Sequence, residues 1–243
     1  MPNVFHAQRE LLFKIVYYGP GLGGKTTNLE YIHANTRPGR RGKLLSLSNE
    51  SERTLFFDFL PVELGAFRGY SLRLHLCTVP GQFAYDETRQ LILRNVDGVV
   101  MVVDSQPEML EENRVSLANL GANLALVGLD STRVPLVMQF NKQDLPTALS
   151  KDRLRDELGI PDDVPQLEAS AKYGGGVSET LRTMVRECLK LVSDPHLLPE
   201  GRTPSVLPGQ RESMFPDVIP QELMLPRAPR APLEVSLKLA KDD

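Results

Sequence analysis

The chain has 243 residues, of which 41% are hydrophobic, so it can bury the core of one ordinary domain and still carry an extension. Its net charge of −3 excludes the strongly basic balance that is typical of proteins binding nucleic acid or an anionic membrane. The two cysteines, Cys77 and Cys188, lie far apart and predict neither a metal site nor a disulfide framework.

No segment has the length of a membrane-spanning helix, and neither end carries a secretion or lipidation signal. We therefore expect a cytoplasmic protein that binds no nucleic acid and has no direct membrane anchor. Attachment to any membrane would depend on partners.

Apolar runs and helical patterns alternate from about residue 10 to residue 193. Short apolar or alternating stretches predict strands at 13–18, 43–47, 72–77, 98–103, 135–140 and 167–171. Apolar residues at helical spacing predict core-facing helices over 117–127 and 181–192. This alternation predicts an α/β fold, with a mostly parallel central sheet and helices on both faces.

A glycine-rich turn follows the first predicted strand and opens a helix. It matches the pattern G-x-x-x-x-G-K-[ST] at Gly19, Gly24, Lys25 and Thr26, in the strand–turn–helix context that a phosphate-binding loop requires. Inward-pointing N–H groups and the helix N-terminus favour anions, Lys25 supplies a cation to the β- and γ-phosphates, and the Thr26 hydroxyl is placed to ligate Mg²⁺. The residues predicted to bind phosphate here are Gly19, Gly21, Leu22, Gly23, Gly24, Lys25, Thr26 and Thr27.

The phosphate loop leaves ATP and GTP open, and the segment N-K-Q-D at 141–144 favours GTP. It follows a predicted strand, at the carboxyl end where open α/β sheets bind ligands. A carboxylate at Asp144 can accept hydrogen bonds from guanine N1–H and the exocyclic amine, a donor pair that adenine lacks, which argues against a P-loop kinase or ATPase. The residues predicted to bind guanine are Asn141, Lys142, Asp144, Ser170, Ala171 and Lys172.

Three segments carry a family resemblance: P-G-L-G-G-K-T-T-N at 20–28, R-T-L-F-F-D-F-L-P at 53–61 and T-V-P-G-Q at 78–82. Through them the chain resembles the Ras-like small GTPases, and more narrowly the bacterial MglA branch associated with cell polarity and gliding motility. The resemblance covers about residues 10 to 193. It implies a three-layer P-loop NTPase fold and slow, Mg²⁺-dependent hydrolysis of GTP to GDP and phosphate.

The resemblance also implies roles for residues outside the phosphate loop. Thr54 would ligate Mg²⁺ when the γ-phosphate is present, Gly81 would bind that phosphate through its N–H, and Gln82 would orient the attacking water. Arg53 would stabilise the developing charge as an arginine finger supplied in cis, with a solvated loop charge as the alternative and Arg89 as a weaker competitor. The predicted catalytic residues are thus Gln82, Arg53 and Lys25, and the predicted metal ligands are Thr26 and Thr54.

Thr78 departs from the Ras pattern, because most Ras-like proteins carry there an aspartate that holds a Mg²⁺-bound water. Threonine is neutral, so Thr78 can contact the metal site only indirectly, and we expect magnesium to be held less firmly. MglA-like proteins share this threonine. The segment S-A-K at 170–172 is a second departure, since it is closer to the general Ras pattern than to this branch.

The expected output of the protein is the ordering of residues 49–60 and 79–90 around the γ-phosphate. Apolar residues in the first segment (Leu55, Phe56, Phe57 and Phe59) suit either the core or a surface for nucleotide-dependent effectors. The resemblance implies a roadblock-fold, MglB-like activator and recruitment to a cell pole by partners. The alternative is a scaffold that stays bound to GTP.

The composition changes near Asp194. Nine of the 19 prolines lie between Pro195 and Pro232, a density that blocks regular helix and central strand. We therefore divide the chain into a Ras-like G domain at 1–193 and an irregular, proline-rich, partly extended extension at 194–243. Alternating apolar residues predict a terminal strand at 233–239, and the extension suits either a disordered linker or a docked segment.

Overall fold

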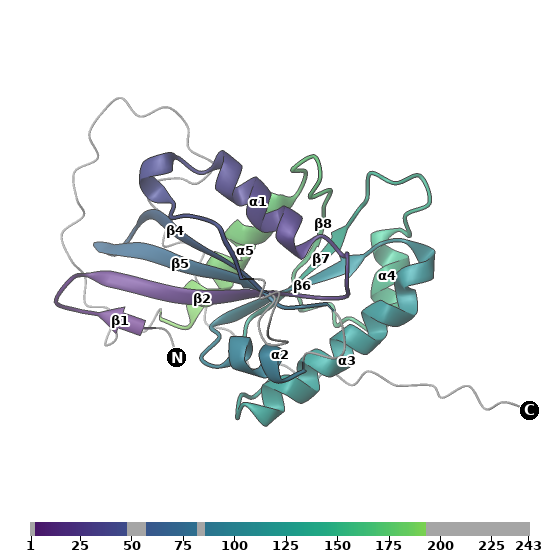
Figure 1. Cartoon of the computed structure of the whole chain (residues 1–243). Helices are drawn as coiled ribbons and strands as arrows, with labels where there is room; N and C mark the ends of the chain where they lie inside the picture. Colours follow the sequence, from purple (N-terminus) through teal and green to yellow (C-terminus); the bar gives the residue numbers. More distant parts are fainter. Residues whose placement is uncertain (1–2, 48–56, 82–85, 193–243) are drawn as a thin grey trace, which may run out of the picture.

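A twisted central sheet runs through the computed structural model, which describes residues 3–47, 57–81 and 86–192 (Figure 1). The strands are β1 Asn3–Phe5, β2 Glu10–Tyr18, β3 Leu45–Leu47, β4 Phe57–Phe67, β5 Tyr70–Thr78, β6 Gly98–Asp104, β7 Leu136–Asn141 and β8 Gln166–Glu168. The helices are α1 Lys25–Asn35, α2 Asp86–Leu93, α3 Leu110–Leu126, α4 Lys151–Leu158 and α5 Val177–Lys190, with short 3₁₀ turns at Pro38–Arg40 and Pro107–Met109.

Within the described residues the strands form one sheet in the order β3-β4-β5-β2-β6-β7-β8, with β1 paired to β2 outside this path. The five strands from β5 to β8 in this order pair in parallel, whereas β1, β3 and β4 pair antiparallel. The prediction of an α/β fold with a mostly parallel sheet is therefore confirmed.

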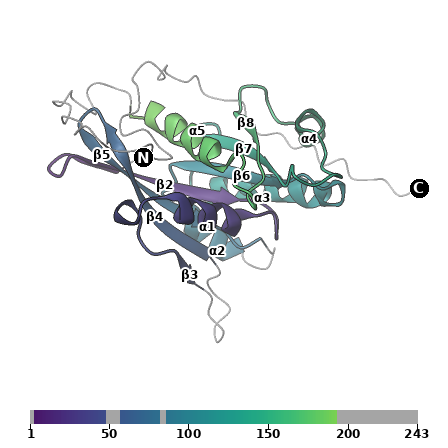
Figure 2. The ribbon, with the colours of Figure 1, turned by 90° about the horizontal axis from the view of Figure 1, so that it is seen from above.

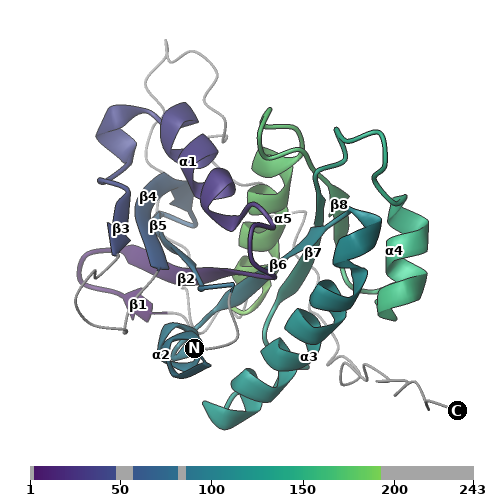
Figure 3. The same cartoon turned by 45° about the vertical axis from the view of Figure 1, so that its right-hand side comes forward.

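Helices cover both faces of the sheet. The helices α1 and α5 pack on one face, which Figure 2 views from above, and α2, α3 and α4 pack on the other (Figures 1 and 3). Strand β6 serves both layers, because Val100 and Val102 join the first core cluster and Val99, Met101 and Val103 join the second. A strand that is buried on both faces has a continuous apolar sequence, which explains why this strand could be predicted from the sequence.

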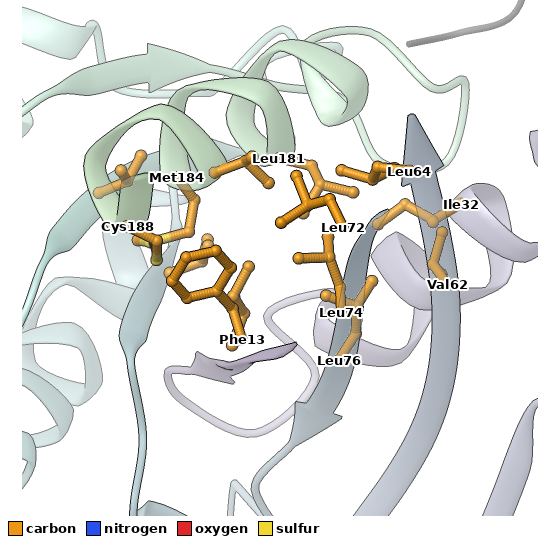
Figure 4. Packing of buried hydrophobic residues seen from close by; sticks show 14 of the residues in the cluster. Phe13, Ile32, Val62, Leu64, Leu72, Leu74, Leu76, Leu181, Met184 and Cys188 are labelled. Carbon is orange, nitrogen blue, oxygen red and sulfur yellow. Dashed lines mark hydrogen bonds between the residues drawn. The ribbon is translucent and has the colours of Figure 1, made fainter. Parts of the chain in front are cut away.

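The first core cluster fixes α5 against the sheet. Figure 4 shows Met184 and Cys188 of α5 beside Phe13 of β2, and Leu181 beside Leu72 of β5. All five side chains are almost fully buried. This packing fixes α5, which lies mainly over β6 and β7, to the side chains of β2 and β5 as well. It leaves the carboxyl ends of the parallel strands to the loops that follow them.

The longest strand, β4, was not predicted. Its buried face alternates as expected, but Pro61 and Gly65 lie within it and argue against a strand. The register slips by one residue between Leu64 and Ala66, so the glycine sits at a bulge. Two left-handed residues, Arg68 (φ 48°) and Gly69 (φ 81°), then join β4 to β5 in a tight hairpin.

Several expectations fall on residues that the structure does not describe. These are the extension at 194–243 with its terminal strand at 233–239, and much of the two switch segments. Within the described ranges, no helix combines the length and the apolar character needed to cross a membrane.

Candidate functional site

The phosphate loop lies at the carboxyl end of β2, and α1 begins directly after it at Lys25. Gly24 precedes the helix with a φ of 98°, and a Cβ there would lie 2.2 Å from Nδ2 of Asn141. A side chain is excluded at this position both by the backbone conformation and by the close neighbour. The glycine thus allows the loop to approach the segment that follows β7.

Lys25 is held beneath the loop. Its ammonium donates to the carbonyl oxygens of Gly19 at 2.9 Å and Pro20 at 2.6 Å, and only 7% of the residue is exposed. Burial lowers the pKa of Lys25 to about 8; the charge of Arg89 lowers it further, and that of Asp58 raises it. An arriving phosphate would favour the charged form of the lysine, so anion binding and protonation of Lys25 are coupled.

Asn141 joins the two predicted nucleotide-binding loops. Its amide nitrogen donates to Gly23 O at 2.8 Å, and its amide oxygen accepts from the Ala171 N–H at 2.8 Å. The side chain is buried at the end of β7. One side chain therefore sets the position of the phosphate loop relative to the segment 170–172, as expected of a residue that ties loops together.

Asp144 lies exposed beside Ser170, whose hydroxyl donates to Asp144 Oδ1 at 2.6 Å. Lys142 has a left-handed backbone (φ 67°), and its ammonium lies 2.5 Å from Asp104 Oδ2 at the end of β6. Asp104 could not be singled out from the sequence, because its partner Lys142 directly follows β7, the next strand of the sheet. Lys172 is exposed, with its ammonium 5.2 Å from the ring centroid of Tyr173.

A buried carboxylate, Asp58 of β4, lies under the first turn of α1. It accepts hydrogen bonds from the hydroxyls of Thr26 at 2.6 Å and Thr78 at 3.0 Å, both to Oδ2, and from Ser46 at 2.7 Å to Oδ1. Its own N–H donates to Thr78 Oγ1 at 2.8 Å. Asp58 was not predicted from the sequence to be a site residue. Two sequence features could have indicated it: a charge within the apolar stretch F-F-D-F-L, and the neutral residue Thr78.

These oxygen atoms suit Mg²⁺, which prefers hard oxygen ligands and usually binds through few protein groups together with substrate phosphates and water. Among the described residues no cluster of three or more His, Cys, Asp or Glu side chains could form an all-protein metal cage. Thr26 is an exposed residue whose hydroxyl is bonded to a carboxylate, which fits an ion shared with a nucleotide.

Gly81 packs directly on the phosphate loop. A Cβ at Gly81 would lie 2.3 Å from the Cα of Gly21 and 2.8 Å from the carbonyl carbon of Pro20, so only glycine allows this contact. The predicted phosphate sensor is thus next to the predicted phosphate cradle. Three other predicted residues, Arg53, Thr54 and Gln82, lie outside the described residues.

Arg89 is built into the core rather than presented to the loop. It is 3% exposed, its Nε donates to Pro80 O at 3.0 Å, and its Nη1 donates to Asp86 and Asn119 at 2.9 Å each. These bonds hold α2 to α3 and to the segment before Gly81. The contacts favour a structural role over that of an arginine finger.

Of the four apolar residues named in the first switch segment, only Phe57 and Phe59 are described. Both are partly buried on β4 and line a pocket of about 320 Å³ together with Lys14, His75, Cys77, Leu91 and Ile92. They therefore contribute to the second core layer and also face a hollow beside α2.

A buried asparagine joins the phosphate loop to the predicted guanine-binding segment at one end of a mostly parallel sheet. This arrangement defines the class of the protein: a P-loop nucleotide-binding protein with a site suited to guanine. The model of the ADP-ribosylation factor family matches residues 66–192. The chain is 51% identical to the mutual gliding-motility protein MglA of Myxococcus xanthus over 186 residues, which cover 76% of this chain and 95% of that protein. The chain therefore belongs to the MglA-type, Arf/Ras-like small GTPases, and it is a GTP hydrolase.

More distant similarity extends to translational GTPases. The chain is 35% identical to elongation factor 4 of Desulforudis audaxviator over 179 residues, which are 27% of that protein's length. The match to elongation factor 4 of Sorangium cellulosum is 28% over 162 residues and covers 25% of that protein. Similarity to such a small share of these longer proteins is what a common GTP-binding domain produces.

Proposed function

We propose that this protein is a GTP-dependent switch in gliding motility or cell polarity. It binds GTP and GDP, hydrolyses GTP with Mg²⁺, and signals through the order of residues 49–60 and 79–90. The 51% identity to a gliding-motility protein, over nearly that protein's whole length, carries the biological part of this proposal. The bridge that Asn141 makes between the two loops supports the chemical part.

The nucleotide lies along the carboxyl edge of the sheet. The phosphates contact the backbone N–H groups of Gly19, of residues 21–27 and of Gly81, with the Lys25 ammonium as counter-charge. Asp144, which Ser170 orients, accepts the two guanine donors. A backbone N–H of the segment 170–172 donates to the guanine carbonyl.

Hydrolysis needs little covalent chemistry from the protein, because positioning and electrostatics supply most of the effect. Gln82 orients the attacking water, and Arg53 stabilises the charge that develops on the phosphate oxygens. Thr26 and Thr54 would hold Mg²⁺, which would neutralise negative charge on the phosphates. Lys25 remains protonated while the phosphates surround it.

A roadblock-fold partner similar to MglB accelerates the reaction by ordering the segment that carries Arg53. Such a partner has no need to donate an arginine of its own. Effectors that distinguish GTP from GDP bind the switch segments, and such partners recruit the protein to a cell pole.

Single-turnover hydrolysis tests this switch against the alternative of a permanently GTP-bound scaffold. The wild type should convert bound GTP to GDP, and Gln82→Leu should slow the conversion at least about tenfold. Conversion that is negligible in both proteins, with and without a roadblock partner, would favour the scaffold.

The arginine finger is tested in the presence of the partner. Arg53→Ala should abolish most of the stimulated turnover, since a finger contributes about a thousandfold or more. Arg133→Ala is the matched control, because Arg133 is exposed and its side chain pairs with Asp130 on a turn. Full stimulation of Arg53→Ala would exclude a finger in cis.

A further inference from the structure

A polar side chain interrupts the buried strand β7. The strand has the sequence L-V-M-Q-F-N, and each of its residues is buried. Val137 belongs to the core layer under α1 and α5, whereas Met138 and Phe140 belong to the opposite layer. The alternation of side chains along a strand therefore directs Gln139 toward α1 and α5, which lie side by side over that face (Figure 3). An amide is unexpected there, because a strand covered on both faces is usually apolar.

Gln139 pairs with an equally buried amide on α1, that of Asn28. The Asn28 Nδ2 donates to Gln139 Oε1 at 2.8 Å, and the Gln139 Nε2 donates back to Asn28 Oδ1 at 2.9 Å. Each amide nitrogen carries a second hydrogen. Asn28 donates it to Gly24 O at 2.9 Å, and Gln139 donates it to Thr180 Oγ1 at 3.0 Å. Both amides are 0% exposed, and all of their hydrogens have an acceptor.

The carbonyl at one end sets the direction of every bond that follows. Gly24 O can only accept, so it fixes the nitrogen of Asn28 on its side and, through the reciprocal pair, the orientation of Gln139. The Thr180 hydroxyl must then accept from Gln139, and it donates its own hydrogen to Gly176 O at 2.8 Å. This polar run leads from Gly24 to Gly176, and no amide in it can turn over without leaving buried polar atoms unpaired.

Both ends of the polar run belong to the predicted nucleotide-binding loops. Gly24 is the last glycine of the phosphate loop and directly precedes α1. Gly176 directly precedes α5 and ends the loop that begins with the predicted guanine-binding segment 170–172. The polar run therefore connects the same two loops as Asn141, but it does so from inside the core.

A purely structural role explains these amides poorly. Apolar side chains of the same shape would fill the space without the cost of taking amide groups out of water. Neighbouring residues such as Ile32 of α1 and Leu181 of α5 pack in this core layer with no polar group. Directional bonds are useful where two segments must keep a fixed separation, as two loops must when they bind opposite ends of one ligand.

We propose that Asn28, Gln139 and Thr180 form a second connection between the phosphate loop and the guanine-binding loop, and that this connection positions the two loops to retain the nucleotide. Because all three residues are 0% exposed, they act through the backbone of the loops and not by contact with the nucleotide. This inference rests on the proposed guanine-nucleotide site and adds positioning residues to it.

The test measures how fast the full chain releases fluorescent GDP into excess unlabelled GDP. The urea midpoint of the nucleotide-free protein is measured beside it, since bound nucleotide would itself add stability. The double variant Asn28→Leu/Gln139→Met replaces both amides by apolar side chains of similar shape and leaves no amide hydrogen unpaired. It should keep the wild-type midpoint but release GDP about tenfold faster or more. Release within about twofold of the wild type would overturn the proposal.

The single variant Gln139→Met shows what the amides do for stability. It leaves the Asn28 amide without its partner, so it should lower the urea midpoint and also speed up release. Adding Asn28→Leu should restore the midpoint but not the release rate, because the connection is already broken. A release rate that recovered together with the midpoint would show that the amides serve stability alone, and it would overturn the proposal.

Thr180 supplies a separate comparison in case the amide variants fold poorly. Thr180→Val keeps the shape of the side chain and removes the bond to Gly176 O, whereas Thr180→Ser keeps the hydroxyl. Thr36→Val is the matched control, because Thr36 is also a buried threonine that donates to the carbonyl four residues earlier, Ile32 O at 2.7 Å, but at the C-terminal end of α1.

Thr180→Val should release GDP about three- to tenfold faster than the wild type, and the other two variants should stay within about twofold of it. Equal release from Thr180→Val and Thr36→Val would overturn the proposal. These outcomes leave the proposed function intact as long as the wild type retains GDP. Failure of the wild type to retain GDP would instead overturn the nucleotide site itself.

Discussion

Replacing Asn141 by alanine should separate the phosphate loop from the guanine-binding segment. The wild-type side chain makes two bonds of 2.8 Å, to Gly23 O and from the Ala171 N–H, and is 2% exposed. The variant leaves both backbone groups without this partner in a buried setting. Each such group costs about 1–3 kcal/mol, so the combined loss is about 2–6 kcal/mol.

We expect this loss to weaken GDP binding, because both orphaned groups belong to loops that the nucleotide contacts. A loss of about 2 kcal/mol corresponds to roughly thirtyfold in the dissociation constant, and larger losses to more. Titration of fluorescent GDP measures the affinity, and a urea titration shows how much of the cost falls on the free energy of unfolding instead.

Asn35→Ala provides a matched control, since the Asn35 amide donates an exposed hydrogen bond to Tyr31 O at 2.9 Å. It should change GDP affinity less than about twofold, as surface substitutions usually do. If Asn141→Ala bound GDP within about threefold of wild type and was equally stable, the reasoning that Asn141 joins the two loops would be refuted.

Three further predictions concern buried charge and the guanine segment. Burial raises the pKa of Asp97 from 3.8 to about 6. Because the pKa is raised in the folded state, the stability that this group contributes is present below about pH 4 and is lost as the pH rises through about 6. The free energy of unfolding of Asp97→Asn, measured in urea, should therefore exceed that of the wild type by up to about 3 kcal/mol at pH 7 and by nothing near pH 4. Equal stability of the two proteins at neutral pH would contradict this. Since burial lowers the pKa of Lys25 to about 8, GDP affinity should fall between about pH 7 and about pH 9 in the wild type but stay level in Lys25→Arg, and a level wild-type profile would refute the coupling. Ser170→Ala removes the hydroxyl 2.6 Å from Asp144 and should weaken GDP about two- to tenfold in a titration; an unchanged affinity would mean that Asp144 needs no such support.

The parts of the fold that the sequence predicts are those fixed by local pattern. The runs at 98–103 and 135–140 became β6 and β7 with nearly the same bounds, because central parallel strands are apolar on both faces. The phosphate loop was equally predictable, because its glycines, lysine and threonine lie close together in the sequence and their spacing is that of a phosphate-binding loop.

The features that could not be predicted from the sequence depend on pairing between distant segments. Pro61 and Gly65 obscured β4, and its antiparallel partner became evident only in the sheet. Asp58 acquires meaning from Thr26, which is 32 residues away, and from the threonine across the strand pair. Asp104 likewise meets Lys142 only because β6 and β7 are neighbours. Contacts of this kind follow from register, which residue types alone do not determine.

The relation between the two strands also changes the interpretation of Thr78. Taken alone, a neutral residue in that position implies a weaker hold on magnesium. In the structure, two hydrogen bonds join Asp58 of β4 to this threonine, so a carboxylate lies beside the position.

Displacement of bound fluorescent GDP by unlabelled GTP and by ATP tests most directly whether the two joined loops form a guanine-nucleotide site. GTP should displace the probe at concentrations close to those of unlabelled GDP. ATP should require about a thousandfold more or fail altogether, because adenine cannot supply the two donors that Asp144 accepts. Displacement by ATP at concentrations comparable to GTP would contradict the account.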